Sequence, residues 1–96
     1  MQGYVRLDPA GGLILRAYAE LVNITAPLST MTKDFTAVAH VAIAGNTAEV
    51  TGLKGGVTWV AYRDFERQMR ARGVSRVYWE RHRADGSIKL VMRELT

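Results

Sequence analysis

The stretch that decides the fold is residues 48–83, AEVTGLKGGVTWVAYRDFERQMRARGVSRVYWERHR. Residues 48–53 alternate apolar and polar side chains, which is typical of a strand, and Gly55-Gly56 then interrupts the alternation. Residues 58–72 follow a helical period, and residues 74–83 return to a pattern rich in β-branched and aromatic residues. The stretch therefore predicts a strand, a glycine turn, a helix and a second strand, in that order.

The predicted helix, residues 58–72, is amphipathic. Thr58 is a preferred N-cap residue, and Gly73 suits the left-handed position that follows a helix. Three apolar residues at four-residue spacing predict the face that packs on a sheet: Ala61, Phe65 and Met69. The opposite face is expected in water, with Glu66 and Arg70 spaced for an ion pair: Arg63, Glu66, Arg67 and Arg70.

Shorter segments on either side of this stretch predict further strands at residues 4–8, 35–43 and 88–95. Residues 13–24 fit both a helical stripe and a strand alternation, and the helical stripe is slightly favoured. Residues 25–34 predict a loop. We therefore expect a single α+β domain over residues 1–96, with a mostly antiparallel sheet of five to six strands. One main helix (58–72) should pack on one face of that sheet.

Composition narrows the class of protein. The chain has 96 residues, 48% of them apolar, which is enough for one modest core. It has no cysteine, so disulfides, thiolate metal sites and a cysteine nucleophile are excluded. No apolar run reaches the roughly 20 residues of a membrane span, and we expect a cytoplasmic protein with no membrane partner. His40 and His82 stand apart from any carboxylate pattern, so no metal site is predicted.

The junction between the first strand and the helix is the first candidate site. Two glycines there let a ligand approach the backbone, and the amides at the start of a helix can hold an anion such as a phosphate. The cradle would comprise Leu53, Lys54, Gly55, Gly56, Val57 and Thr58. A plain turn that reverses the chain, with Thr58 as N-cap, explains the same residues equally simply.

Residues 40–83 resemble the cofactor-binding half of the GNAT acyltransferase superfamily. In that family a hairpin and a strand lead into a glycine-bearing turn and a helix, and a junction like Arg72-Gly73-Val74 opens the next strand. The resemblance implies a GNAT-like β-β-α-β core, with the two strands around the helix parallel. It also implies acetyl-coenzyme A or another acyl-coenzyme A as cofactor, with its pyrophosphate on the amides of residues 55–58 and its acyl arm along residues 50–53.

Two residues are candidates for acid–base chemistry. Glu49, on the strand before the junction, is the candidate general base for an amine substrate, and Tyr78 is the candidate acid. Each also suits an ordinary strand position, with Glu49 solvated and Tyr78 packed on the sheet.

The second half of the chain suggests a different function. Residues 63–96 carry nine cations against five anions, which accounts for the whole net charge of +4. A basic surface of this kind attracts nucleic acid or an acidic protein. The candidate contacts lie on the helix and on the following strand: Arg63, Arg67, Arg70, Trp79, Arg81 and Arg83. Trp79 also fits a core position. A homodimer through an exposed strand edge is expected, and a structural assembly subunit is a third reading.

Overall fold

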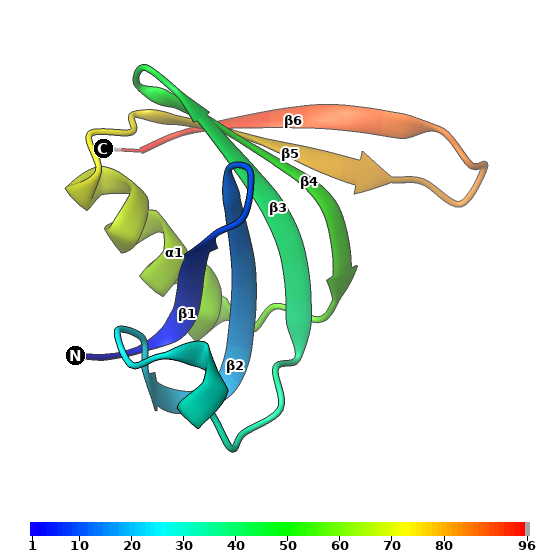
Figure 1. Ribbon diagram of the computed structural model, residues 1–96. Coiled ribbons are helices and arrows are strands. Elements are labelled where there is room, and N and C mark those ends of the chain that lie inside the picture. Colours follow the sequence, from blue (N-terminus) through cyan, green and yellow to red (C-terminus); the bar gives the residue numbers. More distant parts are fainter. Residues whose placement is uncertain (96) are drawn as a thin grey trace.

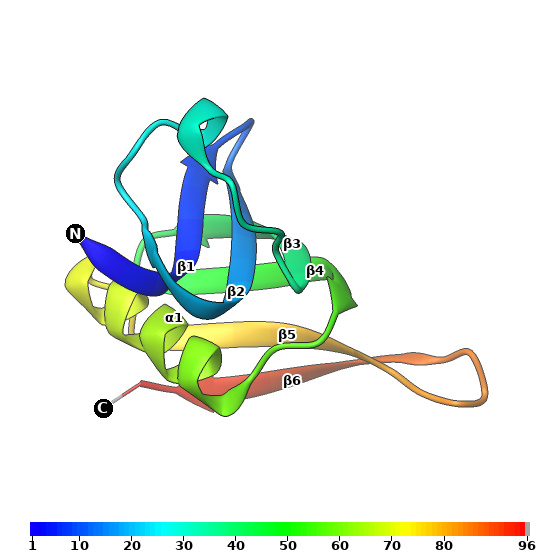
Figure 2. The ribbon, with the colours of Figure 1, turned by 90° about the horizontal axis from the view of Figure 1, so that it is seen from below.

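The computed structural model describes residues 1–95, without the side chain of Arg81. Within these residues it forms one six-stranded sheet with one α-helix against its concave face (Figures 1 and 2). Each strand neighbours the next one along the chain. The elements are β1 (Gln2–Pro9), β2 (Leu13–Asn23), the short 3₁₀ helix η1 (Leu28–Thr30), β3 (Ala37–Ala44), β4 (Thr47–Gly55), α1 (Trp59–Ala71), β5 (Arg76–His82) and β6 (Ile88–Glu94).

The sheet is mixed. All neighbouring strands pair antiparallel except β4 and β5, which pair parallel. The parallel pair follows from α1, because a strand that returns in the same direction needs a crossover connection rather than a hairpin. The α+β class, the mostly antiparallel sheet and the helix on one face are confirmed.

The slight preference for a helix over residues 13–24 is wrong, because this segment is the strand β2. The alternating pattern prevails since β2 pairs with β1 on one side and β3 on the other. Its alternate residues Leu15 and Ala17 are only 2% and 0% exposed. The hairpin into β2 has Gly11 and Gly12 at positive φ, a backbone region that glycine enters without strain.

The helix α1 matches its sequence signals closely. Thr58 is the N-cap, its hydroxyl accepting the N–H of Ala61 at 3.2 Å, and Gly73 follows the helix with φ +81°. The stripe of Ala61, Phe65 and Met69 is at most 1% exposed. One expectation fails: Glu66 is 5% exposed rather than in water, because Arg93 of β6 reaches across and binds its carboxylate.

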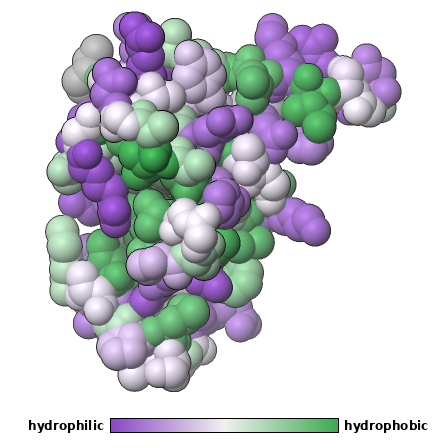
Figure 3. Space-filling model, turned by 45° about the horizontal axis from the view of Figure 1, so that its top comes forward, coloured by the Kyte–Doolittle hydropathy of each residue, from purple (hydrophilic) through white to green (hydrophobic). Residues whose placement is uncertain are grey.

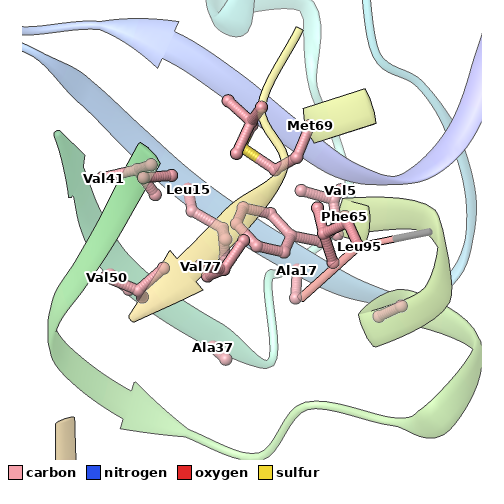
Figure 4. Close-up of a cluster of buried hydrophobic side chains, with 14 residues drawn as sticks. Val5, Leu15, Ala17, Ala37, Val41, Val50, Phe65, Met69, Val77 and Leu95 are labelled. Carbon is pink, nitrogen blue, oxygen red and sulfur yellow. The ribbon is translucent and has the colours of Figure 1, made fainter. Parts of the chain in front are cut away.

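The core lies between α1 and the concave face of the sheet (Figure 4). Phe65 and Met69 project from the helix toward apolar residues of all six strands or their ends, including Val5, Leu15, Val41, Val50, Val77 and Leu95. The β5–β6 hairpin extends past this core as a projecting arm (Figure 1). In the described part of the chain, no helix has the length and apolar character needed to cross a membrane.

Candidate functional site

The most distinctive feature of the sheet is a fork between β4 and β5. Their parallel ladder covers four residue pairs, from Thr47 opposite Arg76 to Val50 opposite Trp79. Beyond the ladder β4 continues to Gly55 and β5 to His82, and the two strands diverge (Figures 1 and 2). We call residues 51–55 of β4 and 80–82 of β5 the fork.

A β-bulge in β4 explains why the strands part. The register between β3 and β4 shifts because two residues, Gly52 and Leu53, stand opposite the single residue Ala39. Gly52 has φ +64°, which glycine adopts easily. A bulge bends its strand and increases the twist, so β4 leaves the direction that β5 keeps.

The side chain of Glu80 bridges the fork. Its Oε1 accepts the backbone N–H of Gly52 at 2.8 Å, and this contact is exposed to solvent. The N–H of Gly52, in the bulge, is therefore directed between the diverging strands, where it donates its hydrogen bond to the carboxylate of Glu80. The carbonyl oxygen of a ligand has the same acceptor chemistry as that carboxylate.

The six residues predicted as an anion cradle divide between strand and turn. Leu53, Lys54 and Gly55 belong to β4, not to a turn. A Cβ on Gly55 would stand 2.1 Å from the carbonyl oxygen of Thr36, so close packing against the start of β3 accounts for this glycine. The N–H of Gly56 donates to the same carbonyl at 3.2 Å. Val57 packs against the core, and the hydroxyl of Thr58 caps α1.

Glu49 and Tyr78 come together in the structure. They are direct partners in the β4–β5 ladder, one pair before the fork opens, and so share the convex face of the sheet. Glu49 is exposed and Tyr78 is half-buried. The structure therefore places the two candidate acid–base residues side by side at the base of the fork.

Aromatic rings form a continuous row from the surface into the core. Trp59 stacks on Tyr62 with ring centroids 5.7 Å apart, and Tyr62 and Phe65 each lie within 5.4 Å of the Trp79 ring. Trp79 therefore packs against the core, which was the alternative to its role as a contact residue for a partner. The exposed ring is Trp59, at 63%, which the sequence reasoning missed although it lies off the buried stripe.

The environment of Tyr62 raises the pKa of its hydroxyl. Burial, followed by the charge of the neighbouring Glu66, raises the pKa of its hydroxyl above the ordinary value. The Arg93 guanidinium, 5.5 Å from the ring centroid, opposes that shift without cancelling it. The hydroxyl therefore stays protonated throughout the neutral range.

A groove of about 620 Å³ runs along the outer side of α1. Its lining includes the exposed Trp59 and four arginines: Arg63, Arg67, Arg70 and Arg93. Two of the arginines bind buried carboxylates, Arg67 that of Asp64 and Arg93 that of Glu66. With four cations against two carboxylates, the groove keeps a positive balance. We call it the arginine groove.

The other predicted contact residues lie apart from this groove. Arg83 is at the far end of the β5–β6 hairpin, where its N–H closes the turn onto Ser87. The side chain of Arg81 is outside the described part of the structure. His40 contacts the carbonyl of Gly11 at 3.3 Å, and the described residues hold no group of three metal-ligating side chains.

Comparison with known proteins gave no match to a protein-family model, to a curated protein or to a solved structure. Any assignment of function therefore depends on the geometry of this chain.

Proposed function

We propose that the fork between β4 and β5 binds the pantetheine arm of an acyl-coenzyme A. The observation that supports this is the early end of the parallel ladder at Val50 and Trp79, while both strands continue. Diverging strands offer backbone donors and acceptors to an extended chain laid between them, as in strand addition. The pantetheine arm is such a chain, since it is linear and carries amide groups.

The β-bulge supplies a backbone N–H that could polarise the thioester carbonyl of the ligand. The N–H of Gly52 is directed into the fork and now meets Glu80. When a thioester carbonyl takes the place of that carboxylate, the same N–H polarises the carbonyl and stabilises the oxyanion formed on attack by an amine. Glu80 must first swing out, because its charge would repel the oxyanion.

Glu49 and Tyr78 would serve as base and acid in such a transfer. Their place in the ladder, one pair before Val50 and Trp79, puts them at the closed end of the fork. A carboxylate there accepts the proton of the attacking amine, and a phenol returns one to the departing thiolate. Coenzyme A binding is the first step and can be tested without turnover.

Isothermal titration of the full chain with acetyl-coenzyme A tests the binding. The sharpest variant is Glu80→Ala, which frees the N–H of Gly52 and removes an anion from the path of the ligand. We expect this variant to bind more tightly than the wild type. Glu94→Ala is the matched control, because it removes an exposed carboxylate from the same hairpin, away from the fork.

Titration with 3′,5′-adenosine diphosphate, which lacks the pantetheine arm, shows how much of the affinity comes from the nucleotide. The gain in affinity of Glu80→Ala should appear with acetyl-coenzyme A and not with this nucleotide. Absence of heat at millimolar acetyl-coenzyme A for wild type and Glu80→Ala refutes the proposal. An equal gain from Glu80→Ala and Glu94→Ala would show a simple charge effect and refute the role of the fork.

The arginine groove favours a second candidate function, binding of single-stranded nucleic acid. Arginines beside an exposed tryptophan combine phosphate neutralisation with a surface for base stacking. Anisotropy of a labelled single-stranded oligonucleotide should show binding that weakens steeply with salt. Arg63→Glu and Trp59→Ala should each reduce it, while Arg72→Glu, at the C-cap of the same helix and outside the groove, should reduce it less. Equal effects of Arg63→Glu and Arg72→Glu would reject the groove as the binding surface.

A further inference from the structure

The two edges of the sheet are protected very differently. At the β1 edge, the carboxylate of Asp64 accepts the N–H groups of Tyr4 and Val5 at 2.8 and 3.0 Å. The amide of Gln68 donates to the carbonyl of Val5 at 2.8 Å, and the strand is also bulged between Gly3 and Val5. Helix side chains therefore occupy backbone groups that would otherwise attract another strand.

The β6 edge has no comparable cover within the described residues. β6 is regular, contains no proline, and pairs with β5 on one side only. Its convex-face side chains are all apolar from residue 88 to 92, and strongly exposed: Ile88 at 56%, Leu90 at 55% and Met92 at 45%. On the projecting arm that this hairpin forms, apolar side chains are exposed among hydrophilic ones (Figure 3). We call these three residues the β6 stripe.

We propose that β6 pairs antiparallel with β6 of a second copy of this chain, about a two-fold axis at Leu90. The pairing continues the sheet through both copies and gives the free backbone groups of each edge a partner. Each stripe then meets its own copy, with Leu90 opposite Leu90 and Ile88 opposite Met92. A second copy fits because the stripe is symmetric about Leu90, with one apolar residue two positions before it and one two positions after it. A copy that runs in the opposite direction therefore presents an apolar side chain opposite each of the three.

The charges of β6 select this register over its neighbours. An axis at Val91 would place Lys89 opposite Arg93, and like charges directly opposite are unfavourable. An axis at Met92 would place Leu90 opposite Glu94 and leave Ile88 beyond the paired region. With the axis at Leu90, Lys89 faces Val91 instead. Arg93 then stays free to bind Glu66 within its own copy.

Sedimentation velocity of the full chain tests the association. We expect a dimer for the wild type and a monomer for Leu90→Asp, which places two carboxylates across the axis. Leu28→Asp is the matched control, because Leu28 is 41% exposed on η1, away from β6, and this variant should remain dimeric. Circular dichroism should show that both variants stay folded, as expected for exposed sites.

Disulfide crosslinking tests the register, since the chain has no cysteine of its own. Leu90→Cys should crosslink to its copy under mild oxidation, because directly opposed residues in antiparallel strands meet the Cα spacing of a disulfide. Met92→Cys alone should not, since its two copies lie about 13 Å apart along the strands. The double variant Ile88→Cys/Met92→Cys should crosslink again.

A wild-type chain that sediments as a monomer at every concentration overturns the dimer. Crosslinking of Met92→Cys as fast as Leu90→Cys overturns the register. Neither result bears on the fork, so this inference can fail while the proposed function stands.

Discussion

Replacing Asp64 by alanine should destabilise the protein strongly. Most charged side chains of α1 are exposed, where substitutions have small effects on stability, but the side chain of Asp64 is buried. The side chain is 8% exposed, and its Oδ2 accepts the N–H groups of Tyr4 and Val5. Each hydrogen bond to a charged group contributes about 1.5–3 kcal/mol, and a buried N–H left without a partner incurs its desolvation cost. The variant also no longer has to desolvate a carboxylate on folding, and this offsets part of the lost hydrogen-bond energy. We therefore expect the free energy of unfolding to fall by about 3 kcal/mol in total.

Urea unfolding followed by tryptophan fluorescence measures that loss, and a domain of this size should melt roughly 12–24 °C lower. Asp64→Asn keeps an oxygen acceptor for both N–H groups and should cost only about 1 kcal/mol. Asp34→Ala, in an exposed loop, is the control and should stay within about 0.5 kcal/mol of the wild type. If Asp64→Ala behaves like Asp34→Ala, the carboxylate does not hold β1 and the account of that edge is wrong.

Three further predictions concern other elements. Gly55→Ala should cost clearly more than Gly86→Ala in urea unfolding: both glycines have positive φ, but only at residue 55 would the new Cβ meet a carbonyl oxygen; equal losses would disprove that reason. Thr58→Ala should cost about 1 kcal/mol by removing the helix cap, with loss of helical ellipticity at lower temperature as the readout. Burial and Glu66 raise the pKa of Tyr62, so the folded state holds this proton more tightly and stability should fall as pH rises through the ordinary value of 10.0; Tyr62→Phe should flatten that fall in unfolding curves, and an unchanged slope would contradict it.

The helix could be predicted almost to the residue, because its signals are local. A capping threonine, an apolar stripe and a glycine after the last turn all act within a few positions of one another. β2 could not be assigned in the same way. Residues 13–24 satisfy both periodicities, and only the neighbouring strands β1 and β3 favour the extended form by pairing with it.

The candidate site could be predicted only in part. The sequence directs the search for a site to residues 48–83, but the opening of the fork depends on a bulge against β3. An isolated glycine inside a strand pattern is the signal that could have indicated the bulge at Gly52. Nothing local to Gly52 indicates that Glu80 would bond to its N–H, since that carboxylate comes from β5, after the helix.

Residue order along the chain thus sets the helix, the hairpin turns and the alternating faces of the strands, because these depend on backbone preferences and side-chain periods a few residues long. The tertiary structure decides which carboxylates are buried, which sheet edge is covered and where β4 leaves β5. Asp64 meets β1 and Glu66 meets β6 across long stretches of sequence. Such contacts depend on the position of each strand in the whole sheet, and a sequence pattern a few residues long does not predict that position.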